Sequence, residues 1–425
     1  MYNVVELFSG IGSQVRALQN IGVETNVLGT CEWDIHASVA YDAIHNTEPV
    51  SSSIAKMSRE ELLEVLKGYT LSNNGKEAMK FSTLKQYPLE ILKHVYASIV
   101  NGKNFVDVSS LTGEAMPKNV DILTYSFPCQ DLSNVGAFHG YNKGIDKGSG
   151  SRSSLLWQVG RILQEMKDDH KRLPRFLLME NVPSLLSKRH LGNFEVWIKD
   201  LEDLGYISKY FRLNACDFGL PQNRPRLLMI SVWVGQNETR KRKVKEFFDS
   251  KNSEEVVADY KKSGFFHKKE VKDLLRINYN EKKYLREASE CNPNNTSSRK
   301  RIWDENPQLV LKGNVINPHF SMVRTITTKQ DRNPNSGNLY FAPSEKGKSS
   351  FRYLTPRECL LFMGFTDGDY ENIVRKNDCM DGSRVLFPRD KIIRLAGNSI
   401  PVRLLEGIFY QIKQIDEQII RKESI

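Results

Sequence analysis

The 425-residue sequence has few of the features that mark secreted, disulfide-rich or membrane proteins. Its six cysteines include no CxxC pair, so we expect reduced thiols and neither a disulfide framework nor a zinc ribbon. No apolar run approaches the roughly 18 residues that span a bilayer. The opening residues, MYNVVELFSG, lack a basic segment before a short apolar stretch, so no secretory signal is expected. These absences predict a cytoplasmic protein without a membrane segment.

Positive charge is present in excess, and it is unevenly placed. Lys and Arg number 61 against 51 Asp and Glu, a formal net charge of +10. Residues 236–302 alone carry 18 Lys and Arg against 11 Asp and Glu, an excess of seven. This local excess fits a polyanionic partner, and it fits a solvated lysine-rich surface equally well. Charge alone leaves both interpretations open.

The first half of the chain alternates strand and helix signals. Apolar segments typical of buried strands lie at 4–8, 23–31, 120–127, 176–180 and 226–234, and helical spacing occurs at 13–21, 153–166 and 194–204. This rhythm predicts an α/β fold with a mostly parallel, doubly wound sheet.

The rhythm stops after residue 234, which predicts a change of domain. We expect residues 1–234 to form the first part of the α/β domain, with a charged, partly helical insertion at 47–104. Residues 235–385 are rich in Lys, Asn, Ser and Pro and are expected to form a smaller domain. Residues 386–425, with an amphipathic helix from 401 to about 419, are expected to return to the first domain.

A turn at Phe8-Ser9-Gly10-Ile11-Gly12 follows the first strand, and Glu32-Trp33 ends the second. Glycines at such a turn let a ligand approach the backbone, and an acidic residue after the next strand can accept hydrogen bonds from ribose hydroxyls. The third glycine of a dinucleotide fingerprint is absent, since Val15 stands there. The pattern favours a nucleoside ligand without a pyrophosphate, and a structural turn with a surface Glu is the alternative.

Three further segments lie at strand ends and carry reactive side chains: the first two follow strands, and the third leads into one. Cys129, in FPCQDLS, precedes a glycine-rich loop, so it is either a nucleophile or a structural thiol. Glu180, in ENV, is either a proton donor in a water-poor site or a carboxylate at a helix N-terminus. Arg224 and Arg226, in QNRPR, either recognise an anion or carbonyl oxygen or form surface salt bridges.

Taken together, these segments resemble the C5-cytosine DNA methyltransferase family. The motifs appear in the family's order: FSGIG (8–12), Glu32-Trp33, FPCQDLS (127–133), ENV (180–182), QNRPR (222–226), RYLTPRECLLFMGF (352–365) and AGNSI (396–400). The catalytic part is particularly similar to the CpG-methylating enzymes of wall-less bacteria. The resemblance covers the chain except residue 235 to about residue 320, where the family has its variable target-recognition region. It implies a Rossmann-like S-adenosylmethionine-dependent methyltransferase domain with a smaller target-recognition domain.

The resemblance implies methyl transfer to C5 of a cytosine that is rotated out of duplex DNA. Cys129 matches the thiolate that adds to cytosine C6 and makes C5 nucleophilic. Glu180 matches the acid that acts at N3, with Asn181 supporting it. Arg226 matches the arginine that holds the base's carbonyl oxygen, and Arg224 is a neighbouring active-site cation. No metal is required.

The resemblance also implies the methyl donor, S-adenosyl-L-methionine, and its product, S-adenosyl-L-homocysteine. The implied cofactor residues are Phe8, Gly10, Ile11, Gly12, Glu32, Trp33, Asp107, Pro128, Leu155, Asn398 and Ile400. The implied DNA contacts are Gln130, Ser133 and Arg152 in a mobile catalytic loop, and Thr325 and Thr327 at the end of the recognition region. The basic run 240–243 either holds backbone phosphate or is a solvated loop.

We therefore expect a monomeric bacterial DNA (cytosine-5) methyltransferase that acts on double-stranded DNA, near the nucleoid, in a restriction-modification system. Its cognate restriction endonuclease is not expected to form a stable complex with it. Three alternatives remain: a transfer-RNA cytosine methyltransferase, a nicotinamide oxidoreductase, and a non-enzymatic DNA-binding regulator. The long basic insert argues against the first, the FPCQ, ENV and QNRPR motifs against the second, and intact Cys129, Glu180 and Arg226 against the third.

Overall fold

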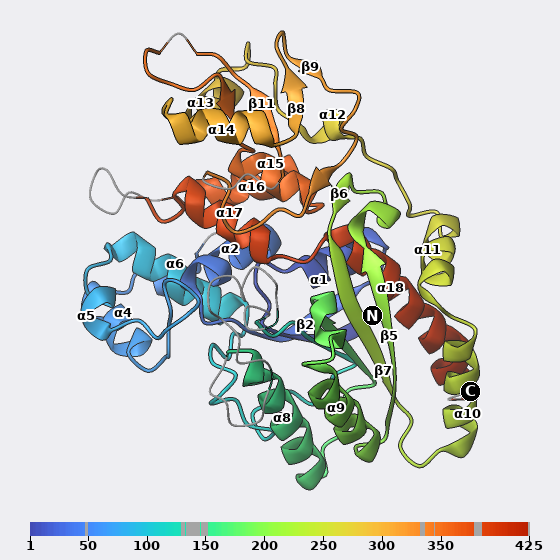
Figure 1. Ribbon diagram of the computed structural model, residues 1–425. Coiled ribbons are helices and arrows are strands. Elements are labelled where there is room, and N and C mark those ends of the chain that lie inside the picture. The colour runs from blue at the N-terminus through green and yellow to red at the C-terminus, as the bar shows by residue number, and fades with distance from the viewer. Residues whose placement is uncertain are drawn as a thin grey trace. The chain divides into compact units, whose positions relative to one another are not determined.

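A six-stranded sheet forms the centre of the first part of the chain in the computed structural model (Figure 1). The structure describes residues 1–46, 50–128, 132, 145, 152–331, 336–343, 345–377 and 385–423. The chain divides into two compact units. Unit 1 contains Met1–Leu213, Pro225–Phe265 and Leu404–Ile425, and unit 2 contains Asn214–Arg224 and Phe266–Arg403.

The sheet of unit 1 has the strand order β2-β1-β3-β4-β7-β5. Its strands are β1 (Tyr2–Leu7), β2 (Thr25–Cys31), β3 (Ile122–Tyr125), β4 (Phe176–Asn181), β5 (Tyr206–Asn214) and β7 (Pro225–Trp233). β1 pairs in parallel with β2 and β3, β3 pairs in parallel with β4, and β4 pairs antiparallel with β7. Because β2 and β3 lie on opposite sides of β1, the strand order reverses there. Open α/β sheets bind ligands at such a switch point, outside the carboxyl ends of the strands.

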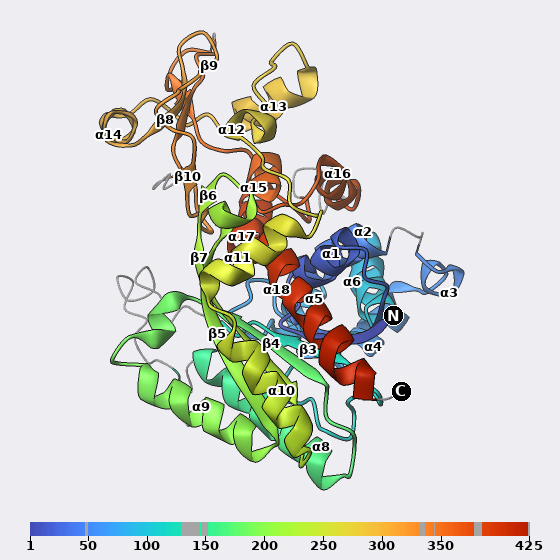
Figure 2. The same ribbon diagram turned by 90° about the vertical axis from the view of Figure 1, so that its right-hand side faces the viewer.

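Alternating side chains of the strands bury both faces of the sheet. Leu7, Tyr125 and Met179 belong to one buried cluster that also contains residues of α8 (Leu156–Asp168) and α9 (Leu191–Asp203). Trp197 of α9 is fully buried in this cluster, where its indole Nε1 donates to the Tyr125 hydroxyl at 3.2 Å. The opposite face is covered by α1 (Ser13–Asn20), α2 (Ile35–His45) and α18 (Val402–Ile415), as the two views of Figures 1 and 2 show.

The other helices of unit 1 lie in the expected insertion and after β7. The insertion contains α3 (Ser52–Ala55), α4 (Arg59–Leu66), α5 (Phe81–Leu84) and α6 (Leu89–Asn101), and α6 packs against α2. α10 (Glu238–Asp249) and α11 (Ser253–Lys262) follow β7. Short helical turns complete the unit at η1 (Arg152–Leu155), η2 (Pro183–Leu186), η4 (Asp416–Ile420) and η5 (Arg421–Glu423).

Unit 2 contains a four-stranded sheet, a two-stranded sheet and a group of helices. The larger sheet has the order β12-β11-β8-β9, and β6 pairs in parallel with β10. The strands are β6 (Gln222–Asn223), β8 (Gln308–Leu311), β9 (Val315–Ile316), β10 (Val323–Arg324), β11 (Asn338–Tyr340) and β12 (Phe351–Arg352). The helices are η3 (Ala215–Phe218), α12 (Val271–Leu274), α13 (Lys282–Glu290), α14 (Ser297–Glu305), α15 (Pro356–Phe362), α16 (Asp367–Arg375) and α17 (Arg389–Asn398).

The RYLTPREC segment has a structural role within unit 2. Thr355 caps α15 in a capping box with Glu358, and Pro356 is at the first helical position. Arg352 donates to both oxygens of Glu358, at 2.7 and 2.8 Å, and both side chains are fully buried. Removing either partner would leave an uncompensated buried charge, so this segment fixes the core of unit 2.

The predicted α/β fold with a mostly parallel sheet is confirmed. The five strands expected from the sequence all form, with ends within three residues of the expected ones, and β5 is an additional strand. The unit boundaries differ from the expected domain boundaries, because residues 235–265 belong to unit 1, and residues 214–224 and 386–403 belong to unit 2. The reason for the first difference is that α10 and α11, although rich in Lys, bury Val244, Phe248, Val256 and Tyr260.

Candidate active site

The carboxyl ends of four neighbouring strands bring the predicted reactive segments to one edge of the sheet. Leu7 of β1 is opposite both Cys31 of β2 and Tyr125 of β3, and Tyr125 is opposite Met179 of β4. Neighbouring strands lie about 4.8 Å apart, so the four strand ends span roughly 15 Å. The residues that directly follow these four positions are Phe8, Glu32, Ser126 and Glu180.

The Glu180 carboxylate at this edge is held by residues of two other strand ends. Its Oε1 lies 2.9 Å from Nε of Arg226, at the start of β7. Its Oε2 accepts a hydrogen bond from the hydroxyl of Ser126, which directly follows β3. The Glu180 and Arg226 side chains are only 9% and 11% exposed. The structure thus brings together two residues that the sequence separates by 46 positions, in surroundings with little water.

Asn181 connects the end of β4 to the segment that leads to Cys129. Its side-chain Nδ2 donates to the carbonyl oxygen of Phe127 at 3.1 Å, and its Oδ1 accepts from the N–H of Val182 at 2.9 Å. The carbonyl of Pro128 accepts a hydrogen bond of 2.6 Å from the Ser153 hydroxyl. The backbone immediately before Cys129 is therefore held from two sides.

Several predicted residues lie outside the described part of the chain. These are Cys129, Gln130 and Ser133, together with the side chain of Arg152. Leu155, in η1, is described, and it packs against the buried cluster that includes residues of α8.

The turn at residues 8–12 has an unusual backbone. Phe8, Gly10 and Gly12 have φ angles of 58°, 55° and 78°, in the left-handed region that residues other than glycine rarely adopt. The N–H of Phe8 donates to the carbonyl of Cys31 at 2.8 Å, which connects the turn to β2. Glycine adopts this region without strain, so only Phe8 carries a conformational cost, which contacts with the surrounding structure must offset.

Glu32 holds the same turn from the β2 side. Its Oε2 accepts a hydrogen bond of 3.1 Å from the N–H of Gly10. Asn104 fixes the Glu32 backbone, accepting from its N–H at 3.0 Å and donating to its carbonyl at 2.9 Å. Burial, followed by the charges of Glu32 and Asp107, raises the pKa of the Cys31 thiol. The two predicted acidic residues therefore lie around the same end of β2.

The residues around this turn fit an adenosine-type cofactor. A side chain at Gly10 would meet no atom within 4 Å, so the space beside the turn is open. Trp33, next to Glu32, is half-buried and offers an aromatic surface, and Phe8 is also half-buried. The side chain of Ile11, another predicted cofactor residue, is buried.

Arg224 has a different environment from Arg226, only two residues away. Its side chain is 2% exposed in unit 2. Its guanidinium donates to the carbonyl oxygens of Ile326 at 2.7 Å, Gly397 at 2.8 Å and Ser399 at 2.8 Å. These contacts connect the TIT segment with the AGNSI segment, so Arg224 has a structural task within its own unit.

The remaining predicted residues are also in unit 2. The Thr325 hydroxyl donates to the carbonyl of Asn223 at 2.7 Å, and the Thr327 hydroxyl donates to the carbonyl of Lys329 at 2.8 Å. Asn398, at the end of α17, is exposed, whereas Ile400 is buried. The hydroxyls of Thr325 and Thr327 thus both hold backbone carbonyl groups of their own unit.

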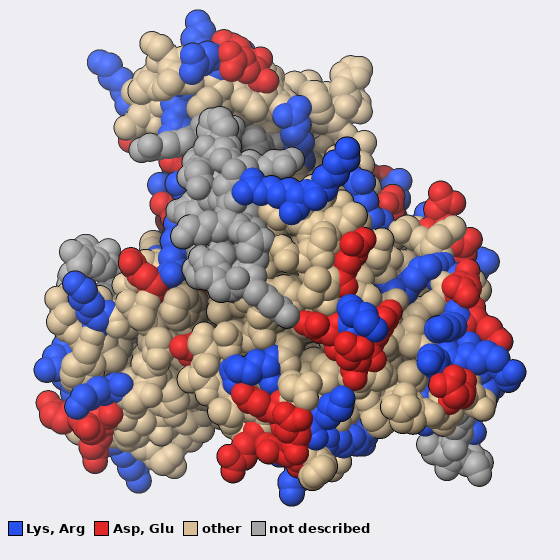
Figure 3. Space-filling model, turned by 60° about the horizontal axis from the view of Figure 1, so that its bottom comes forward, with Lys and Arg blue, Asp and Glu red and all other residues tan. Residues whose placement is uncertain are grey.

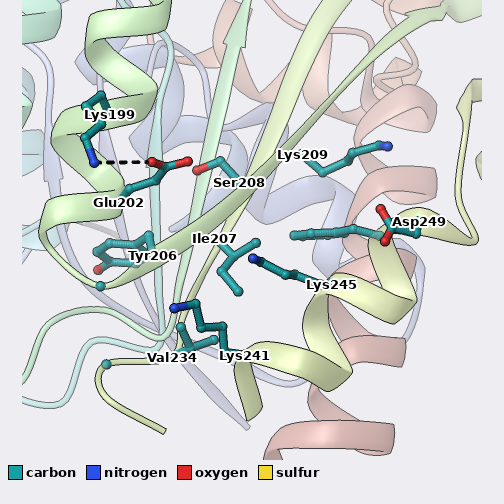
Figure 4. A pocket seen from close by; sticks show the side chains of 13 residues that line it. Lys199, Glu202, Tyr206, Ile207, Ser208, Lys209, Val234, Lys241, Lys245 and Asp249 are labelled. Atoms are coloured by element: carbon teal, nitrogen blue, oxygen red, sulfur yellow. Dashed lines mark ion pairs between the residues drawn. The ribbon is translucent and has the colours of Figure 1, made fainter. Parts of the chain in front are cut away.

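A pocket of about 570 Å³ lies elsewhere in unit 1 (Figure 4). It is lined by residues of α9, the start of β5, the segment after β7, and α10, including Lys199, Ile207, Val234, Lys241 and Lys245. Val234 lies eight residues beyond Arg226, or roughly 25 Å along an extended strand. Two of its lysines have acidic partners: Lys199 with Glu202 at 3.7 Å, and Lys241 with Glu238 at 3.4 Å. This pocket therefore lies away from the Glu180–Arg226 pair.

The basic run 240–243 lies on α10, not on a loop. Arg242 pairs with Glu246 at 3.8 Å on the same helix, in addition to the Lys241 pair. Figure 3 shows a similar mixture, since red acidic side chains accompany the blue basic ones on the face it draws. These pairs favour the interpretation of the run as a solvated surface.

Within the described ranges, no three His, Cys, Asp or Glu side chains gather closely enough to hold a metal ion. No helix of the described residues has the length and apolar composition needed to cross a bilayer.

The sequence alone did not identify three residues whose side chains contact the predicted segments. Ser126, Asn104 and His45 each contact a predicted segment through a side chain. Ser126 directly precedes FPCQ, so its position after a strand was a usable signal. Asn104 and His45 lie 72 and 34 residues from their partners, and no sequence spacing indicates those contacts.

Comparison with known proteins gives a consistent result. The sequence model of the family described as C-5 cytosine-specific DNA methylase matches residues 69–414. The orphan methyltransferase M.SssI of Spiroplasma monobiae is 32% identical over 422 residues, which cover 96% of each chain. The type II methyltransferase M2.ScrFI of Lactococcus lactis subsp. cremoris is 31% identical over 417 residues, covering 97% of this chain and 99% of that protein.

Solved structures agree at the level of the fold. The crystal structure of the S. pombe Dnmt2 methyltransferase superposes with a TM-score of 0.57 at 17% identity, covering 98% of this chain and 99% of that one. A Spodoptera frugiperda DNMT2 structure superposes with a TM-score of 0.56 at 15% identity, covering 97% and 100%. The resemblance predicted from the seven motifs is confirmed.

Proposed function

The chain belongs to the C-5 cytosine-specific DNA methylase family, and we propose that the Glu180 cluster at the sheet edge is the centre of its reaction. The activity of the chain is methyl transfer to C5 of cytosine in DNA. The observation that carries the assignment of the centre is the Glu180–Arg226 pair, with Ser126, at the carboxyl ends of β3 and β4.

Cys129 is the nucleophile in this proposal. Cytosine C5 is a poor nucleophile, and addition of a thiolate to C6 converts the ring to an enamine that reacts at C5. Cys129 follows the end of β3 by four residues, and Asn181 and Ser153 hold the backbone just before it. After methyl transfer, loss of the C5 proton to a base and elimination of the thiolate restore the ring and the free enzyme.

Glu180 acts as the acid at N3 of the base in this scheme: its carboxyl group donates the hydrogen bond, which makes C6 more electrophilic. Ser126 and Arg226 orient its two oxygens, so the carboxyl group is positioned before the base arrives. Arg226 uses Nε on Glu180 and one Nη on the Pro225 carbonyl, and a guanidinium has further N–H groups to donate to the base's carbonyl oxygen. Asn181 acts through the backbone of Phe127, and Arg224 through the backbone of unit 2.

The residues of the turn 8–12, with Glu32, Trp33 and Asp107, hold S-adenosyl-L-methionine in this proposal. Gly10 leaves the space that the ligand needs, and the two carboxylates can accept hydrogen bonds from its adenosine part. The cofactor supplies an electrophilic methyl group on a sulfonium, and it leaves as S-adenosyl-L-homocysteine. Pro128, Leu155, Asn398 and Ile400 remain proposed members of this site.

Double-stranded DNA is the proposed partner. Unit 2 would read the target in the major groove, with Thr325 and Thr327 at the end of that region, and Gln130, Ser133 and Arg152 would contact the strand beside the flipped base. A monomer in the bacterial cytoplasm suffices for this task. The type II name of one relative fits a restriction-modification system, and the orphan name of the other fits a solitary enzyme.

Bisulfite sequencing tests the proposal. Plasmid DNA from a methylation-free host that expresses the chain should show protected cytosines within one short sequence. The Cys129→Ala variant should give none while it still binds DNA, because only the covalent step is lost. Protection by Cys129→Ala at the level of the parent would refute the nucleophile assignment. A tritium-methyl assay on DNA and transfer RNA in parallel separates the RNA alternative.

A further inference from the structure

The left-handed turn at residues 8–12 is supported from beneath by α2. The Nε2 of His45, in the last turn of α2, lies 3.2 Å from the carbonyl oxygen of Ile11. That oxygen can only accept, so the Nε2 of His45 carries the proton and donates it. The carbonyl of Ile11 thus has a side-chain partner that lies 34 positions away in the sequence.

Gly12 shows how closely His45 approaches the turn. A Cβ at Gly12 would lie 2.2 Å from Nε2 of His45 and 2.8 Å from a ring carbon of Tyr41. The rings of His45 and Tyr41 contact each other with centroids 4.6 Å apart. The end of the turn therefore rests directly on two rings of one helix, with no space between them.

The rings are themselves fixed to β1, the strand that leads into the turn. The Tyr41 hydroxyl donates to Oε2 of Glu6 at 2.6 Å, and the Glu6 side chain is fully buried. Burial, together with the nearby charge of Arg16, lowers the pKa of His45 to about 3, so the imidazole is neutral at physiological pH. The contact between His45 and Ile11 is thus a hydrogen bond from a neutral imidazole at a partly buried position, and its loss would leave the Ile11 carbonyl without this partner.

We propose that His45 is a positioning residue that holds the 8–12 turn in its cofactor-binding conformation. Glu32 holds Gly10 from the β2 side and His45 holds Ile11 from the α2 side, so the two contacts fix the turn from both directions. If the turn relaxes in the absence of the His45 contact, only a fraction of the protein is competent to bind. The apparent dissociation constant then rises by the inverse of that fraction, while turnover at saturation is unchanged.

Calorimetry with S-adenosyl-L-methionine on DNA-free protein tests this proposal, which rests on the proposed function. His45→Leu keeps roughly the volume and removes the donor, and we expect it to weaken binding about tenfold, which is about 1.4 kcal/mol. His45→Gln keeps an N–H at similar reach and should stay within about threefold of the parent. In steady state, His45→Leu should raise KM for the cofactor and leave kcat and KM for DNA unchanged.

The controls separate positioning from general stability. His94→Leu replaces another histidine of unit 1, on α6, and should leave cofactor affinity unchanged. His45→Asn, whose shorter side chain does not reach Ile11, is the second loss-of-contact variant should His45→Leu not fold. Unchanged affinity in His45→Leu or His45→Asn, or equal weakening in His45→Gln, would overturn the proposal. If the parent protein itself does not bind the cofactor, the proposed function fails instead.

Discussion

Replacing Glu6 by Gln should stabilise the protein, and more so at alkaline pH. Glu6 lies on β1, fully buried against α2, where the Tyr41 hydroxyl donates to it at 2.6 Å. Burial raises the pKa of this carboxyl from 4.5 to about 7, and the hydrogen bond from Tyr41 opposes the rise only in part. Gln has the same shape, keeps an acceptor for Tyr41, and carries no charge at any pH.

The size and sign of the effect follow from proton linkage. A raised pKa means that the folded state binds the proton more tightly than the unfolded state, so the group costs stability as the pH rises above 4.5. At about 1.4 kcal/mol for each pKa unit, the cost is below about 1 kcal/mol at pH 5 and reaches about 3 kcal/mol at pH 8. The cost is complete once the pH exceeds the folded-state value of about 7. Glu6→Gln removes it.

Urea denaturation of both proteins at pH 5 and pH 8 measures this difference. We expect the free energies of unfolding of Glu6→Gln and the parent to be similar at pH 5 and to differ by about 3 kcal/mol in favour of the variant at pH 8. Glu64→Gln, at an exposed position of α4, is the matched control and should show no pH-dependent difference. A Glu6→Gln difference that is the same at both pH values would refute the reasoning.

Two further substitutions test the packing of each unit by the same denaturation measurement. Gly397→Ala should destabilise unit 2 by about 1–3 kcal/mol, because its Cβ would lie 2.6 Å from the backbone of Thr327. The control is Gly368→Ala, whose Cβ would make only an ordinary van der Waals contact, so it should be neutral or stabilising. Equal effects of the two substitutions would contradict the close approach at Gly397. Asp416→Ala should cost unit 1 about 1–3 kcal/mol, because the Tyr2 hydroxyl would lose the buried carboxylate that accepts from it, whereas the two arginines on this carboxylate are partly exposed. The exposed Asp390→Ala is its control, and a cost below 1 kcal/mol for Asp416→Ala would show that those contacts add little.

The parts of the fold that the sequence predicts are those with strong apolar periodicity. β3 and β4 are short and fully buried, and their apolar runs can form little else in an α/β chain. β5 was missed because it is an edge strand with charged residues, such as Lys209 and Arg212, among its apolar ones. Charge on an edge strand protects it from unwanted pairing, and the same charge hides it from an analysis of hydrophobicity.

Unit boundaries could not be predicted from composition. The Lys-rich stretch after β7 reads as a change of domain, yet α10 and α11 each bury a narrow apolar stripe. Tyr260 of α11 hydrogen-bonds Glu406 of α18, and both lie in unit 1. A buried stripe of two residues on a strongly basic helix gives a weak periodic signal, so only the contacts reveal where the helix belongs.

In the candidate site, the sequence predicts the residues of the motifs but not the side chains that contact them. Motif order identified Glu180 and Arg226, since strand ends collect reactive groups at one edge. It did not identify Ser126, which donates to the other carboxylate oxygen of Glu180, nor His45, which contacts the 8–12 turn. Such partners are chosen by three-dimensional packing across long sequence separations, and local patterns carry no trace of them.

The QNRPR segment explains why two neighbouring arginines have different tasks. The chain passes from unit 2 to unit 1 between Arg224 and Pro225. Before this point, Gln222 donates to the Phe362 carbonyl at 2.9 Å and accepts from the Ile326 N–H at 3.0 Å, and Arg224 holds three carbonyl groups of unit 2. After it, Arg226 pairs with Glu180 in unit 1. A lysine cannot reproduce the several fixed donors of a guanidinium in either place. Arg224→Lys should therefore lower the free energy of unfolding of unit 2, whereas Arg226→Lys should lower turnover.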